Sequence, residues 1–167
     1  MIKAVKHHLS RFAFALMLVG GVFVTGAAHA ESLNCVQFVK QVSPVALSGN
    51  AHQWWDAAAG QYNRGHAPKP GAVMVFSKTR HLPFGHVAVV RAVRNKRTIL
   101  VDHANWSTIN GRKGHIERAA EVIDVSPKND WSQVRVWYQP LEDIGQTAYP
   151  IKGFVYPKDS KIPHHAR

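Results

Sequence analysis

The sequence predicts a single α+β domain in which N-terminal helices pack on a mostly antiparallel β-sheet. Apolar residues recur at helical spacing only upstream of Gly60. Further along the chain, short runs rich in β-branched residues alternate with polar turns, which is typical of strands. The chain has 167 residues, of which 46% are hydrophobic and 19% are charged. This composition suits one globular domain and excludes wholesale disorder.

The first thirty residues are expected to lie outside this domain. Basic residues precede an apolar run over residues 12–24, and Ala28-His29-Ala30 fits the small-x-small pattern before a signal-peptidase cleavage site. The run is shorter than the roughly 20 apolar residues that cross a membrane. We therefore interpret residues 1–30 as a signal peptide. Export to a bacterial periplasm or the extracellular space follows, with no stable membrane anchor after cleavage; a retained anchor helix is the alternative.

Two helices are predicted at the start of the mature chain. The first covers residues 35–42, where four apolar side chains share one helical face, with Ser32 as a plausible N-cap. The second covers residues 51–59, with Asn50 as its cap and Gly60 just beyond its end. The layout therefore places both helices before the sheet.

The sheet is expected to follow a loop rich in glycine and proline. Its strand candidates are residues 72–76, 86–93, 98–105, 121–125 and 134–138. The second and third form a predicted hairpin in which residue 93 lies opposite 98 and residue 89 opposite 102. Prolines recur from Tyr149 onward, so we divide the mature chain into a domain over residues 31–148 and a loosely ordered tail over residues 149–167.

Cys35 is the candidate nucleophile, since the chain has one cysteine. Oxidising compartments usually pair cysteines, so an unpaired cysteine in an exported protein is a candidate reactive thiol. In the first turn of a helix, backbone amides and the helix dipole favour the thiolate. The alternative interpretation is a small buried apolar residue.

Three polar residues on neighbouring strands are candidates to assist a thiol. His86 begins one strand directly after Gly85, where it can meet the N-terminus of a helix packed on the sheet. His103 and Asn105 are two residues apart on the next strand, so they are expected to share a face near His86. Either of them can orient an imidazole that exchanges a proton with the thiol. Otherwise they are ordinary polar residues at strand ends.

Five segments in this order resemble the CHAP family, the cysteine- and histidine-dependent amidohydrolases and peptidases of cell walls. They are Asn34-Cys35 with its helix, Gly49-Asn50-Ala51 with Trp54-Trp55, Pro70-Gly71-Ala72 with its strand, Gly85-His86-Val87-Ala88, and Ile99 through Trp106. The resemblance implies a papain-like fold related to NlpC-type wall hydrolases, with Cys35 and His86 as the catalytic pair. Where the family usually carries an acidic residue, this chain has His103, as NlpC-type relatives do. We therefore favour His103 as the orienting residue and keep Asn105 as the alternative.

The resemblance also implies the activity: a secreted cysteine peptidoglycan hydrolase that acts through a thioester. The bond cleaved would be the N-acetylmuramoyl-L-alanine amide or a peptide bond. The backbone amide of Cys35 is an expected oxyanion donor. Trp54, Trp55 and Trp106 are candidate substrate-binding residues. No metal or organic cofactor is expected, and the protein is expected to act as a monomer on peptidoglycan.

Two other classes of function remain open at this stage. A non-catalytic wall-binding module is consistent with five tryptophans, a formal charge of +11 and the basic turn over residues 94–97. Charge runs of this kind are usually solvated hairpin ends, and export argues against nucleic acid as the main ligand. A zinc site made of Cys35, His86 and His103 matches no compact ligand spacing.

Overall fold

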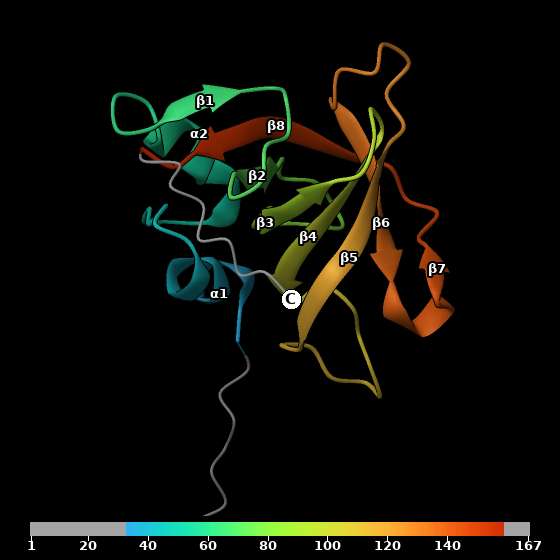
Figure 1. Ribbon diagram of the computed structural model, residues 1–167. Coiled ribbons are helices and arrows are strands. Elements are labelled where there is room, and N and C mark those ends of the chain that lie inside the picture. Colours follow the sequence, from blue (N-terminus) through green and yellow to red (C-terminus); the bar gives the residue numbers. More distant parts are fainter. Residues whose placement is uncertain (1–32, 159–167) are drawn as a thin grey trace, which may run out of the picture. The chain divides into compact units, whose positions relative to one another are not determined.

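The computed structural model describes residues 33–158, which form two short α-helices, two 3₁₀ turns and eight strands (Figure 1). The predicted signal peptide lies outside the described residues. The helical elements are α1 (Cys35–Val42), η1 (Ala51–Gln53), α2 (Trp54–Ala57) and η2 (Gln139–Leu141). The strands are β1 (Asn63–Gly65), β2 (Val73–Phe76), β3 (His86–Val93), β4 (Thr98–Ala104), β5 (Ile116–Asp124), β6 (Gln133–Tyr138), β7 (Asp143–Ile144) and β8 (Tyr149–Tyr156).

Six of these strands close into an antiparallel barrel. Strands β8, β2, β3, β4, β5 and β6 pair in that order, and β8 also pairs with β6. The predicted papain-like α+β fold, with helices packed on a sheet, is therefore wrong. The described chain is mostly β, and its helices are short elements beside the barrel (Figure 1). Closure of the barrel removes the open edges that such a sheet would have had.

The closing strand β8 comes from the segment that we expected to be a loosely ordered tail. Tyr149–Tyr156 pairs with β1, β2 and β6, and Phe154 and Val155 are fully buried. Pro150 is tolerated because it is the second residue of the strand, and its carbonyl still accepts a hydrogen bond from Ser77. Gly153 has φ +136°, and an added Cβ would lie 2.6 Å from the Trp55 ring, so this bend in β8 requires glycine.

Two apolar clusters account for the continuous burial of β2. Met74 and Phe76 belong to a cluster that draws residues from all six barrel strands. Val73 and Val75 belong to a second cluster, in which α1 and α2 pack against the barrel strands. Alternate residues of β2 thus face the two clusters. The start of α1 is held against β3 and β4 by the second cluster, which positions the candidate site.

Most predicted strands are present, with one change of register. In the β3–β4 hairpin, Val89 lies opposite Asp102 as predicted, but Val93 lies opposite Ile99 and not residue 98. The register shifts at Arg91, which is an extra residue on β3 and forms a β-bulge. The predicted helix over residues 51–59 is divided into η1 and α2. Within the described part of the chain, no helix is both long and apolar enough to span a membrane.

Deleting residues 149–167 is expected to abolish cooperative folding. The deletion removes β8 and its buried Phe154, and it leaves β2 and β6 without their shared partner. Loss of Phe154 alone would cost about 3–5 kcal/mol, a large fraction of a typical domain's stability. Thermal unfolding followed by circular dichroism shows whether the shortened chain still unfolds in one cooperative transition. Deleting residues 159–167 is the control, since it keeps every described strand; a sharp, unshifted transition in both deletions would contradict the role of β8.

Candidate active site

A capping box places Cys35 at the first position of α1. The Asn34 carboxamide oxygen accepts a hydrogen bond from the Gln37 backbone amide at 2.9 Å, and the Gln37 side chain accepts one from the Asn34 backbone amide at 3.0 Å. This reciprocal arrangement satisfies two amides that the helix leaves unpaired. The N-cap is therefore Asn34 and not Ser32. As predicted, Cys35 shares the buried face of α1 with Phe38 and Val39.

Burial of Cys35 outweighs the groups that favour its thiolate. Only 9% of the residue is exposed, and burial raises the pKa of the thiol. Backbone hydrogen bonds of Val87, Val36 and Cys35 itself act in the opposite direction but are smaller. Backbone amides at the helix start therefore favour the Cys35 thiolate, as predicted, but burial has the larger effect and the net shift of the Cys35 pKa is upward. The protein at rest holds Cys35 as a thiol, and the same amides are available to stabilise negative charge during a reaction.

His86 and His103 form a buried pair across β3 and β4. His86 Nε2 lies 3.1 Å from His103 Nδ1, and neither residue is more than 3% exposed. Trp106 contacts both rings, with centroid distances of 4.9 Å to His86 and 5.7 Å to His103. Phe76 meets the His86 ring edge-on at 5.4 Å. This packing fixes the orientation of the His86 imidazole.

Burial keeps both imidazoles neutral. It lowers the pKa of His86 well below 6.5, and repulsion between the protonated forms of His86 and His103 and from the Lys113 ammonium lowers it further. It also lowers the pKa of His103 to about 3. When neutral His86 donates a hydrogen bond from Nε2 to His103, the Nδ1 atom of His86 carries no proton. This tautomer of His86 can accept a proton at Nδ1. His103 Nε2 is buried and has no hydrogen-bond partner among the described residues.

This neutral pair predicts that stability falls with acidification below pH 6.5. The folded-state pKa values of both histidines lie below the ordinary value, so the unfolded chain binds more protons in that range. The free energy of unfolding should therefore be complete above pH 6.5 and decline toward pH 4.5. Urea unfolding at pH 7.5 and pH 4.5 measures the loss, and His103→Gln should show a smaller one. If the free energy of unfolding of wild type and of His103→Gln depended equally on pH, His103 would not be a group whose pKa is lowered by folding.

Asn105 does not share the face of His103. Strand β4 ends at Ala104, and Asn105 has φ +65°, so the side-chain alternation of the strand does not continue to it. Its backbone amide donates to the His115 carbonyl at 2.9 Å. The structure thus brings His103, and not Asn105, against the His86 ring, while Asn105 lines the cleft described next.

Two adjoining lobes form a cleft at this site. The Cys35 lobe has a volume of about 460 Å³ and the second lobe about 400 Å³. The residues that line the Cys35 lobe include Asn34, Cys35, Lys40, Phe84, His86 and Asn105. Those that line the second lobe include Trp106, Thr108, Tyr138, Gln146, Thr147 and Tyr149. His81, Leu82, Asn105 and Lys113 line both lobes, and none of the residues lining either lobe is acidic.

Part of the chain matches a known family. Residues 25–105 match the family model described as the CHAP domain. The chain contains a CHAP domain. The family is generally hydrolytic and indicates a peptidoglycan hydrolase or amidase type of activity for this chain. A comparison with curated proteins found no match.

The CHAP match ends before β5, although the fold does not. Cys35, His86, His103 and Asn105 all lie within the matched residues. Strands β5 to β8, which complete the barrel, lie beyond them, as does most of the lining of the second lobe. Within residues 33–158, no group of three or more His, Cys, Asp or Glu side chains is arranged to hold a metal ion.

The three tryptophans proposed to bind substrate have different positions. Trp54 is fully buried in the cluster between the helices and the barrel. Trp55 packs against Arg64, whose guanidinium lies 4.8 Å from its ring centroid, and it lines neither lobe. Trp106 lines the second lobe but is only 8% exposed. Trp106 is therefore the one of the three that lies at the cleft.

Phe84 is an aromatic residue of the Cys35 lobe that sequence analysis missed. It lines the Cys35 lobe and is 64% exposed. Its carbonyl oxygen accepts a hydrogen bond from the His52 backbone amide and lies 3.1 Å from His52 Nδ1. Gly85 allows this approach, because an added Cβ would lie 2.6 Å from the His52 amide nitrogen. A sequence signal existed, since Phe84 directly precedes the Gly85-His86 motif.

Phe84→Ala in this CHAP domain is expected to raise KM about 2–10-fold, with little change in kcat or Tm. An exposed aromatic contact of about 0.5–1.5 kcal/mol would be lost from substrate binding, and no core packing would be disturbed. Steady-state kinetics on a soluble muramyl peptide measures the change. Val93→Ala is the matched control, because Val93 is 42% exposed and lines neither lobe. An unchanged KM for Phe84→Ala would remove Phe84 from the binding surface.

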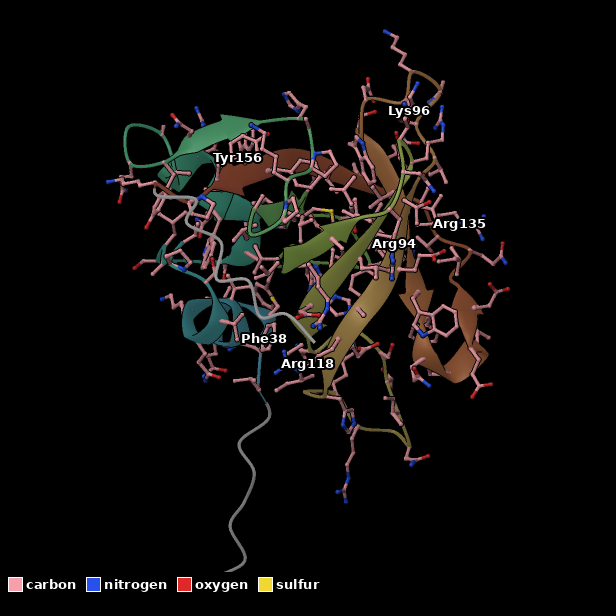
Figure 2. All side chains as sticks on the ribbon, viewed as in Figure 1. Phe38, Arg94, Lys96, Arg118, Arg135 and Tyr156 are labelled. Carbon is pink, nitrogen blue, oxygen red and sulfur yellow. The ribbon has the colours of Figure 1, made fainter. Side chains whose placement is uncertain are left out.

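The basic turn between β3 and β4 is a hairpin end with one anchored arginine. Arg97 donates to the carbonyls of Asp124 and Ser126 at 3.2 and 2.9 Å. Arg94 and Lys96 are exposed, and Lys96 extends away from the barrel (Figure 2). None of these residues lines either lobe of the cleft. The turn is thus separate from the Cys35–His86 site.

Proposed function

We propose that this CHAP-domain protein is an exported cysteine peptidoglycan hydrolase that cleaves an amide bond through a thioester on Cys35. The observation that carries the proposal is the shared cleft of Cys35 and His86, with His86 backed by the buried His103. A thiol, a neutral imidazole and a third group that orients it are the parts that nucleophilic hydrolysis requires. The signal-peptide pattern of residues 1–30 supports export.

In the proposed reaction, the Cys35 sulfur attacks the amide carbonyl carbon as its proton passes to His86. The raised pKa of the thiol and the lowered pKa of His86 favour this coupled transfer over a resting ion pair. The carbonyl oxygen gains negative charge, for which the Cys35 backbone amide is a suitable donor. The C–N bond then breaks as His86 gives its proton to the leaving amine. Water attacks the thioester, His86 accepts its proton, and the acid product and the thiol are released.

The positive charge of the chain supports an anionic polymer as substrate. Without Lys3, Lys6 and Arg11 of the proposed signal peptide, 21 − 3 = 18 Lys and Arg remain against 10 Asp and Glu, and the cleft lining carries no acidic residue. Such a surface attracts the anionic bacterial envelope, and this attraction weakens as salt screens it. The neutral His86–His103 pair is suited to work near neutral pH.

Digestion of purified sacculi tests the proposal. Mass spectrometry of the released fragments identifies the bond. Peptides freed from intact glycan strands indicate the amidase, and cleaved stem or cross-bridge peptides indicate the endopeptidase. Either product supports amide hydrolysis. Binding to sacculi by the folded protein with no fragment released would instead support the non-catalytic wall-binding module.

A further inference from the structure

Lys113 occupies a central position in the cleft that the reaction above does not use. It belongs to the segment between β4 and β5, beyond the residues matched by the CHAP model. It is one of four residues that line both lobes, and of these it alone carries a fixed positive charge. Its charge also lowers the pKa of His86, which places the ammonium group within electrostatic reach of the catalytic imidazole.

The charge of the cleft differs between its two lobes. Lys40 lines the Cys35 lobe alone, and Lys113 lies where the lobes adjoin. Apart from the residues common to both lobes, the second lobe is lined only by neutral residues, such as Thr108, Tyr138 and Gln146. Lys40 and Lys113 together give the lining of the Cys35 lobe two positive charges, which attract an anionic group. The Cys35 lobe therefore suits an anionic ligand group, and the second lobe suits a neutral one.

We propose that Lys113 binds a carboxylate of the substrate where the two lobes adjoin, so that the enzyme selects acidic peptides over the same peptides with a carboxamide. This inference rests on the proposed hydrolase function. An ammonium group is a strong donor to a carboxylate, whereas a carboxamide offers a neutral oxygen and no net charge. Lys113 is then a specificity-determining residue of the cleft.

A matched pair of substrates tests this selection. The probe is N-acetylmuramic acid bearing a stem tetrapeptide, prepared once with a free carboxylate on its second residue and once with that group as a carboxamide. We expect the wild-type kcat/KM to be about tenfold higher for the carboxylate form. Lys113→Gln should lose this preference, mainly through KM for the carboxylate form, and Lys113→Arg should retain most of it.

Arg112→Gln is the matched control. It removes the same charge from the neighbouring position, and both residues are exposed, but Arg112 lines neither lobe. A preference that persists in Lys113→Gln, or that falls equally in both variants, would overturn the assignment to Lys113. Equal cleavage of both probes by the wild type would do the same. Thermal unfolding of each variant shows whether it is folded.

A binding measurement separates this inference from the proposed activity. The Cys35→Ala protein is titrated with both probes by calorimetry, alone and in combination with Lys113→Gln. Tighter binding of the carboxylate form, lost with Lys113→Gln, supports the inference even when neither probe is cleaved. In that case the proposed hydrolysis fails and the carboxylate site stands. Equal affinity of the two probes for Cys35→Ala would refute the site, whatever the outcome of the kinetics.

Discussion

Cys35→Ala should lower kcat for amide hydrolysis by about 10⁴-fold or more. Without the sulfur there is no atom to form the thioester, and the remaining cleft can only bind substrate. Cys35 lies at the first position of α1 and lines the cleft with His86, so no other thiol takes its place. The rate of fragment release from a soluble muramyl peptide, compared with wild type, measures the loss.

Two controls show whether a loss of activity in Cys35→Ala comes from the missing thiol or from unfolding. Cys35 is buried, so its replacement by alanine is expected to cost about 1–2 kcal/mol of stability, and the Tm shows whether the variant stays folded. Cys35→Ser keeps the size and replaces the thiol with a much weaker nucleophile, so it should be nearly as inactive. Wild-type rates in either variant would remove Cys35 from the mechanism.

Loss of His103 is expected to lower kcat by about 10²–10³-fold, whereas loss of Asn105 costs less than about tenfold. His103 holds the His86 imidazole through the 3.1 Å contact between Nδ1 and Nε2, and an imidazole without an orienting partner is a poorer base. Asn105 lies on left-handed backbone after β4 ends, away from the strand face that carries His103. Kinetics of His103→Ala and Asn105→Ala, each with its Tm, compares the two.

The pH profile distinguishes a positioning role of His103 from a purely structural one. Protonation of either imidazole opposes protonation of the other, so His103→Gln should raise the pKa of His86 and move the acidic limb of kcat/KM toward higher pH. The glutamine side chain of this variant also offers an oxygen to His86 Nε2 and should recover part of the activity lost in His103→Ala. Equal activity of His103→Ala and wild type, together with a large loss in Asn105→Ala, would reverse the assignment.

The positions of Cys35, His86 and His103 were largely predictable because these residues occupy local, regular elements. The helical spacing after Asn34 predicted that Cys35 shares a face with Phe38, and the structure places it on that buried face. The β-branched run after His86 predicted β3 with its observed bounds. Two strands joined by a short polar turn formed the expected hairpin, which brought His103 beside His86. Each of these relations depends on residues close together in the sequence.

The fold class was not predictable in the same way, because it depends on a distant strand pairing. β8 closes the barrel by pairing with β2, more than 70 residues earlier in the chain, and with β6. Its proline and glycine obscured the strand pattern, although Pro150 still offers its carbonyl and Gly153 allows the close approach of Trp55. Local propensity gives no information about which strand meets which edge.

Exposure could not be predicted from residue type. Trp54 and Trp55 were expected at the cleft wall because large aromatic residues suit wall ligands. Trp54 is instead fully buried among the apolar side chains of the helix–barrel cluster. Phe84 is exposed at the cleft because the loop before β3 is tied to His52 through its backbone. Position in the folded chain, and not hydrophobicity, decides which aromatic residue contacts solvent.

Trapping the acyl-enzyme tests whether Cys35 is the nucleophile. Wild-type protein is mixed with a soluble muramyl peptide and quenched in acid within the first turnover, and its mass is measured intact and after proteolysis. We expect a mass increase equal to the acyl part of the substrate, located on Cys35, sensitive to hydroxylamine and absent from Cys35→Ala. Substrate turnover with no adduct on Cys35 at any quench time, together with equal turnover by Cys35→Ala, would contradict this role of Cys35.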